Sequence, residues 1–171
     1  MKPLKYEWRN LYYLLMVSFP LVIADQLTKL WALTLKGSEP VVLFESWWRF
    51  IYVENRGALW GIGNDFPIFY RKLIFLGISS VITLFIVYLL VTYSENRLMK
   101  IIYGFVLGGA IGNLIDRFFR GFVVDFVDWH AGDLYHWPTF NIADAAIVVA
   151  VFLLAIEVFF NHKRPSEGVK K

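Results

Sequence analysis

The sequence predicts an all-α membrane protein: a bundle of four transmembrane helices with a small β-rich segment at the membrane interface on the periplasmic side. Composition points to this class, because 58% of the 171 residues are hydrophobic and only 18% are charged. Soluble domains average about 45–50% apolar and about 25% charged residues. In addition, four stretches approach the roughly 20 apolar residues that a spanning helix needs. We expect one membrane-embedded domain over residues 1–171.

The four predicted spans cover residues of about 11–31, 73–93, 101–120 and 140–160. The second span contains no charged residue, whereas the other three carry ionisable side chains near their ends. These include Asp25, Lys29, Asp116, Arg117, Asp144 and Glu157. A charge at the centre of a bilayer costs at least about 2.5 kcal/mol, so intramembrane ionisable residues are candidates for function.

The distribution of positive charge predicts the orientation of the spans. With four spans both termini lie on one side, and the short segments of that side hold nine basic residues: Lys2, Lys5, Arg9, Arg97, Lys100, Lys163, Arg164, Lys170 and Lys171. Lys and Arg are enriched in short cytoplasmic segments, so we expect both termini in the cytoplasm. The loops at about 36–70 and 121–139 then face outward. The small net charge of +3 gives no indication of nucleic-acid binding.

The first outer loop is rich in β-branched and aromatic residues. Residues 41–53 read Val-Val-Leu-Phe-Glu-Ser-Trp-Trp-Arg-Phe-Ile-Tyr-Val. This composition favours strands, and its Trp and Tyr side chains suit the headgroup layer. We therefore expect strands lying on the membrane surface.

Polar residues from several spans and both outer loops are expected to meet in one layer of the outer leaflet. They are Asp25, Asn55, Asp116, Arg117, Asp125 and Asp144. The third span also contains Gly104, Gly108 and Gly112, spaced four residues apart and followed at the same spacing by Asp116. Such a ridge without side chains allows close approach of another helix. Asn113 and Arg117, one turn apart, project together.

Each polar residue also has a structural interpretation. Asn141 followed by Asp144 resembles a helix cap, an interpretation that stands beside a catalytic role and is compatible with it. Asp116 with Arg117 fits structural charge pairing, and Asp25 with Lys29 fits a local ion pair. Asp125 is different, because apolar residues flank it in Gly-Phe-Val-Val-Asp-Phe-Val-Asp and no adjacent cation compensates it.

The remaining residues restrict the chemistry to a pair of carboxylates. The chain has no cysteine, and no serine lies in a Gly-x-Ser-x-Gly motif. His130 and His136, with Asp128 and Asp133, lack a helical metal-ligand spacing, so we assign neither a metal nor another cofactor. Two carboxylates that share a site hold one proton between them, as in aspartic proteases. The competing interpretations are a small transporter with a proton relay and a non-catalytic scaffold.

Five ordered motifs resemble those of the bacterial lipoprotein signal peptidase family (signal peptidase II). They are Asp25-Gln26-Leu27-Thr28-Lys29, Asn55-Arg56-Gly57-Ala58, the run from Gly108 to Arg117, Gly121-Phe122-Val123-Val124-Asp125-Phe126 and Phe140-Asn141-Ile142-Ala143-Asp144. The resemblance covers about residues 10–160. One departure is Leu59-Trp60, where the family usually has a small residue and then Phe.

The resemblance implies an aspartic endopeptidase of the bacterial cytoplasmic (inner) membrane with its active site toward the outer face. It implies cleavage of prolipoproteins before a cysteine that carries a diacylglyceryl group, and inhibition by globomycin-type peptide antibiotics. Asp125 and Asp144 match the catalytic pair. The matching supporting positions are Asp25, Asn55, Gly57, Asn113, Asp116, Arg117 and Asn141. Membrane lipid is the other expected partner, and we expect a monomer.

Overall fold

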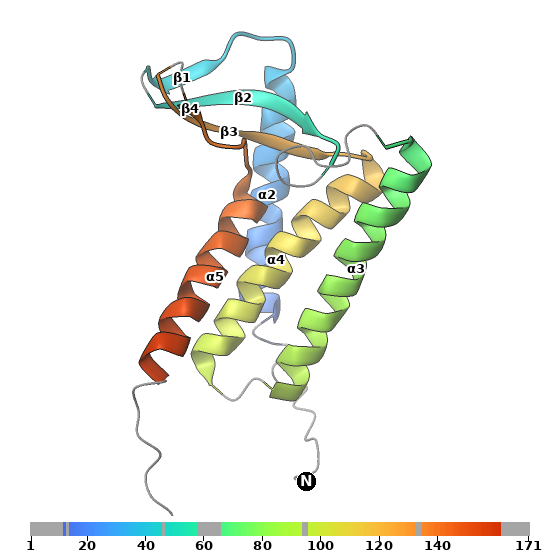
Figure 1. Cartoon of the computed structure of the whole chain (residues 1–171), viewed down its shortest axis with the longest axis vertical. Helices are drawn as coiled ribbons and strands as arrows, with labels where there is room; N and C mark the ends of the chain where they lie inside the picture. Colours follow the sequence, from blue (N-terminus) through green and yellow to red (C-terminus); the bar gives the residue numbers. More distant parts are fainter. Residues whose placement is uncertain are drawn as a thin grey trace, which may run out of the picture.

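The computed structural model describes residues 12, 14–45, 47–57, 66–93, 96–132 and 135–161. Its helices form an elongated bundle, and a four-stranded sheet lies across one end (Figure 1). The helical elements are η2 (Leu14–Ser18), α2 (Phe19–Ala32), η3 (Leu33–Leu35), α3 (Ile68–Tyr93), α4 (Arg97–Phe119) and α5 (Ile142–Asn161). The strands are β1 (Val41–Phe44), β2 (Trp48–Asn55), β3 (Val123–Ala131) and β4 (Tyr135–His136).

Three of the described helices are long and apolar enough to cross a membrane. Their qualifying segments are Leu73–Thr92, Arg97–Phe119 and Ile142–Phe160, with mean hydropathies of 2.6, 1.7 and 2.5. The expected count of four is therefore not confirmed. The first predicted span is a five-residue π-helical turn followed by the 14 residues of α2. Polar Asp25 and Lys29 interrupt the apolar character of α2.

Helix α4 lies at the centre of the bundle, and its glycines allow two neighbours to approach closely (Figure 1). A Cβ atom on Gly104 would lie 2.7 Å from the Cβ of Val17 in η2. A Cβ on Gly108 would lie 3.0 Å from Leu21 Cδ2 in α2. The predicted close packing of this ridge against another helix is confirmed. On the adjacent ridge, Gly109 faces α5.

The helix ends near the sheet are set by local interactions. Helix α4 ends where the carbonyl of Asp116 accepts hydrogen bonds from the backbone N–H groups of Arg120 (2.8 Å) and Gly121 (3.2 Å). Gly121 has a φ of +80°, a left-handed conformation that glycine adopts without strain. This turn redirects the chain from α4 into β3.

The sheet is antiparallel throughout, in the order β1-β2-β3-β4. The strands expected within residues 41–53 are observed as β1 and β2. The segment 121–139, expected only as an outer loop, also supplies β3 and β4. Apolar residues of β3 pack with Ala32 at the end of α2, which fixes the sheet on the helices. The buried core of this contact consists of Ala32, Val124, Phe126 and Val127.

Candidate active site

Asp125 is a buried carboxylate on β3 that is bound by two amides. Only 1% of the residue is exposed. Asn55, near the end of β2, donates from Nδ2 to Asp125 Oδ2 at 3.0 Å. Asn141 donates from Nδ2 to Asp125 Oδ1 at 2.7 Å. Each oxygen therefore has a neutral donor, in agreement with the absence of an adjacent cation in the sequence.

Asp144 lies in the first turn of α5, where the helix dipole favours a negative charge. Asn113 of α4 donates from Nδ2 to Asp144 Oδ1 at 2.8 Å. The backbone N–H of Asn141 donates to Asp144 Oδ2 at 3.3 Å, and the N–H of Asp144 donates to Asn141 Oδ1 at 2.9 Å. This reciprocal pair is a capping box, so the expected helix cap is present.

Asn141 connects the two carboxylates. Its side-chain amide binds Asp125, and its backbone N–H binds Asp144. Burial, the largest cause, and the nearby charge of Asp144 together raise the pKa of Asp125 to about 7, against the lowering effect of the hydrogen bonds from Asn55 and Asn141. Two carboxyl groups that lie close together can share one proton, as in aspartic proteases.

Next to this pair, Lys29 joins Asp25 and Asp116, which are both buried carboxylates. Lys29 Nζ lies 2.9 Å from Asp25 Oδ2 and 3.1 Å from Asp116 Oδ2, and all three side chains are fully buried. Nζ also donates to Asn113 Oδ1 at 2.9 Å. The expected Asp25–Lys29 ion pair is present. Asp116 pairs with Lys29 and Arg120, whereas the expected pairing with Arg117 is not observed.

Asp116 and Asp25 hold the backbone next to Asp125 and Asp144. Asp116 Oδ2 accepts from the N–H of Val124 at 3.0 Å, immediately before Asp125. Asp25 Oδ1 accepts from the N–H of Ala143 at 3.0 Å, immediately before Asp144. Lys29 therefore links two anchors, each adjacent to one carboxylate of the pair. From the sequence, Lys29 was expected only to pair with Asp25, although an ionisable residue within an apolar run is itself a signal of function.

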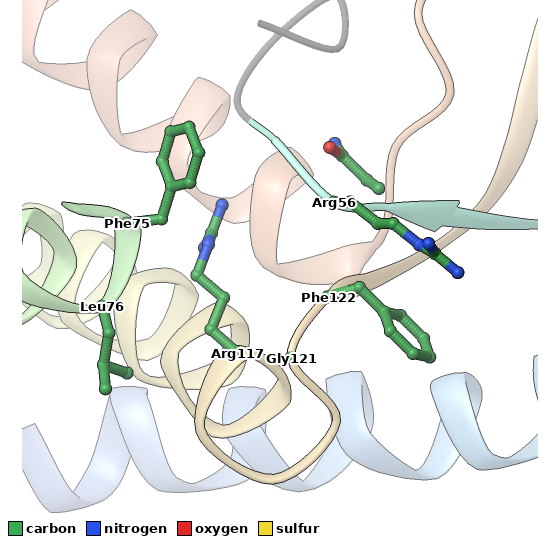
Figure 2. A pocket seen from close by; sticks show the side chains of 7 residues that line it. Arg56, Phe75, Leu76, Arg117, Gly121 and Phe122 are labelled. Carbon is green, nitrogen blue, oxygen red and sulfur yellow. The ribbon is translucent and has the colours of Figure 1, made fainter. Parts of the chain in front are cut away.

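Arg117 and Gly57 lie at the edge of the site. Arg117 Nη2 is 3.5 Å from the carbonyl oxygen of Gly57, and Nη1 is 3.5 Å from the carbonyl oxygen of Asn113. Figure 2 shows Arg117 in a pocket that it shares with Phe75 of α3 and Phe122. The backbone N–H of Gly57 donates to Asn55 Oδ1 at 3.2 Å, which orients the amide that binds Asp125.

The structure thus brings all nine expected site residues into one region at the sheet end of the bundle. Asn55, Asn113 and Asn141 contact the carboxylate pair directly, and Asp25 and Asp116 support it through the backbone. The Leu59-Trp60 departure lies outside the described residues. Towards the other end of α5, Glu157 accepts a hydrogen bond from Asn96, the N-cap residue of α4, at 2.8 Å.

Asp125 and Asp144, joined by Asn141 at one end of a helical membrane bundle, resemble the carboxylate pair that defines the class of membrane-embedded aspartic peptidases. Residues 17–160 match the family model described as Signal peptidase (SPase) II. This match spans most of the chain, which therefore belongs to the signal peptidase II family, and the resemblance drawn from the five motifs is confirmed.

Curated relatives and solved structures agree with this assignment. The lipoprotein signal peptidase of Clostridium tetani is 40% identical over 137 residues, covering 79% of this chain and 85% of the relative. That of Dichelobacter nodosus is 35% identical over 154 residues, covering 88% and 96%. One solved bacterial membrane enzyme superimposes with a TM-score of 0.79 at 27% identity, covering 98% of both chains. A second gives 0.73 at 30% identity, covering 90% of this chain and 95% of the other.

Proposed function

We propose that this enzyme removes signal peptides from prolipoproteins by cleaving before a diacylglyceryl-modified cysteine, with Asp125 and Asp144 as the catalytic pair. The name of the relatives, lipoprotein signal peptidase, supports the substrate class. The observation that carries the assignment of the pair is the double contact of Asn141, whose amide and backbone bind one carboxylate each. Both carboxyl groups can then reach one peptide bond and one water molecule.

In the proposed reaction the ionised carboxylate takes a proton from water as the water oxygen attacks the scissile carbonyl carbon. The protonated carboxyl group donates its proton to the carbonyl oxygen. In the second step the C–N bond breaks as the carboxyl group formed in the first step gives its proton to the leaving amine, and one hydroxyl group of the tetrahedral intermediate returns a proton to the other carboxylate. The pair therefore begins and ends with one shared proton. Asn113 and Arg117 can orient the dyad and hold the peptide backbone.

The segment Leu14–Ala32 forms a fourth span in this proposal. Its 19 residues reach about 28 Å at 1.5 Å per residue, close to the thickness of the hydrocarbon core. It lies along α4 from Gly104 to Gly112, so it would occupy the same depth as a helix that qualifies as a span. Its charged residues face the bundle interior, where Asp25 and Lys29 are fully buried.

We further propose cytoplasmic termini and a site at the outer face of the bacterial inner membrane, based on the basic residues near the chain ends. The sheet then rests on the outer surface. Exposed Val42, Phe44, Trp47 and Trp129 suit contact with lipid headgroups and with the substrate. The diacylglyceryl chains remain in the bilayer while the peptide enters laterally. The concentration of buried charge at one end favours this function over a relay that must connect both faces.

The test is incubation of the purified chain with a diacylglyceryl-modified prolipoprotein, with and without globomycin. We expect cleavage before the modified cysteine, inhibition by globomycin, and no cleavage by Asp125→Asn. Cleavage of an unlipidated precursor at the same rate would contradict the substrate assignment. Full activity of the Asp125→Asn variant would contradict the proposed pair.

A further inference from the structure

A cluster of one carboxylate and two imidazoles lies outside the active site, on β3 and β4. Its members are Asp128, His130 and His136, whose potential ligand atoms all lie within 4.8 Å of one another. Asp128 and His130 are two residues apart on one strand, so their side chains point to the same face. His136 is the cross-strand partner of His130. The register of the sheet, which sequence spacing does not reveal, brings the three together.

His130 presents an unsatisfied nitrogen to this cluster. Its side chain is 6% exposed, and its Nδ1 atom has no hydrogen-bond partner among the described residues. Its Nε2 atom lies 3.3 Å from the carbonyl oxygen of Glu45. A carbonyl only accepts, so Nε2 carries the hydrogen and the neutral ring has its lone pair on Nδ1. This lone pair faces Asp128 Oδ2 at 3.8 Å, an arrangement that a cation stabilises.

Asp128 is held in position by a neighbouring strand. It is 2% exposed, and Arg49 of β2 donates from Nε to its Oδ2 atom at 2.6 Å. The other oxygen, Oδ1, lies 3.2 Å from His136 Nδ1. Metal-binding carboxylates and imidazoles are commonly oriented by such hydrogen bonds on their remaining atoms. The Arg49 contact to Asp128 and the Glu45 contact to His130 are of this type.

We propose that Asp128, His130 and His136 bind a first-row transition-metal dication of the Zn²⁺ type. Imidazole and carboxylate ligands suit this ion. Tetrahedral coordination at about 2.0–2.1 Å brings ligand atoms to about 3.4 Å from one another. The ligand atoms of the three residues lie within 4.8 Å of one another. Rotation of the His136 side chain, which is 44% exposed, brings its nitrogen closer to the other two ligand atoms. Two buried residues therefore supply two of the ligands, and the exposed His136 supplies the third.

The bound ion links β4, which has only two residues, to β3. Asp128 lies three residues from Asp125 on the same strand, so the ion stabilises the sheet that carries one catalytic carboxylate. The site does not enter the proposed cleavage reaction. Its consequence is a metal-dependent increase in the stability of the folded enzyme, since a ligand that binds only the native state raises that stability.

The test is titration of the full-length enzyme in detergent micelles with ZnCl₂, after treatment with a chelator and removal of any polyhistidine tag. Calorimetry measures affinity, and thermal unfolding measures stability. The matched variants are His136→Ala, which removes the exposed ligand, and His162→Ala, which removes the third histidine of the chain.

We expect saturable binding of one Zn²⁺ per chain, a raised Tm, and loss of at least about tenfold in affinity in His136→Ala. His162→Ala should bind as the wild type does. No saturable binding by the wild type would overturn the proposal. Wild-type affinity in His136→Ala, or an equal loss in His162→Ala, would also overturn it. The proposed peptidase function is independent of every one of these outcomes.

Discussion

Asn141 and Asp144 cap each other across the first turn of α5, with side-chain to backbone hydrogen bonds of 2.9 and 3.3 Å in opposite directions. The same Asn141 side chain reaches Asp125 on β3. The residue that initiates α5 therefore also positions the carboxylate pair. Asp144 has two roles in it, a structural one that needs an acceptor oxygen and a proposed catalytic one that needs a titratable group.

The Asp144→Asn variant separates these two roles. An amide oxygen keeps the capping acceptor, so we expect a folded protein that loses about 1 kcal/mol or less. An amide cannot exchange a proton near neutral pH, so we expect turnover to fall by a factor of about 10²–10⁴. Cleavage of lipidated prolipoprotein measures the second effect, and thermal unfolding is the folding control. Near-normal turnover would remove Asp144 from the catalytic pair.

The raised pKa of Asp125 makes stability depend on pH. Between the ordinary carboxyl pKa of 3.8 and about 7, the folded enzyme holds a proton that the unfolded chain has released. The contribution of Asp125 to the free energy of unfolding is therefore fully present below about pH 4. It is lost as pH rises through about 7, and the loss amounts to at most about 4 kcal/mol.

The Asp125→Asn variant removes this titration. We expect its Tm, measured relative to that of the wild type, to increase between pH 5 and pH 8. The matched control is Glu39→Gln, which alters an exposed carboxylate and should show no such trend. A constant difference in Tm across this range would mean that Asp125 is ionised throughout.

Lys29 forms ion pairs with two buried carboxylates, so Lys29→Met should be strongly destabilising. Removing one partner of a buried ion pair typically costs about 3–5 kcal/mol, because the other charge is left uncompensated. We also expect a loss of activity, since Asp25 and Asp116 anchor the backbone before Asp144 and Asp125.

The control for this variant is Lys36→Met. Lys36 pairs with Glu54 at 2.9 Å, but its side chain is 63% exposed, and exposed ion pairs contribute little to stability. Thermal unfolding and expression yield in detergent compare the two variants. Equal effects on Tm would show that the buried network is not a major source of stability.

Gly109 should not tolerate alanine. Its added Cβ would collide with the carbonyl oxygen of Ala143 and lie 2.7 Å from Ile147 Cγ1, both on α5. Overpacking of this kind typically costs about 1–3 kcal/mol. Because α5 carries Asp144, we expect both Tm and turnover to fall.

Gly77→Ala on α3 is the matched substitution, since its added Cβ would meet no atom within 4 Å. Alanine favours helix over glycine by about 1 kcal/mol, so this variant should be as stable as the wild type or more stable. If Gly109→Ala retains both Tm and activity, α4 and α5 are less closely packed than the structure indicates.

The sequence alone identified the membrane class, three helices that qualify as spans, the strands within residues 41–53, and the residues that gather at the site. These features depend on local composition and spacing, because apolar length predicts a span and β-branched, aromatic composition predicts a strand. The capping pair and the Asp25–Lys29 ion pair could also be predicted from the sequence, since both join residues about one helical turn apart.

Tertiary structure determined which side chains of other elements each charged residue pairs with. Asp116 pairs with Arg120 rather than Arg117 through helix geometry alone, since residues i and i+4 face each other and adjacent residues do not. Its pairing with Lys29 of α2 depends on packing, because glycine contacts with two other helical elements set the rotation of α4. The register of β3 with β4 likewise aligned His130 with His136 beside Asp128. Such contacts join residues on different elements, whose relative rotation and register are fixed only when the packed core forms.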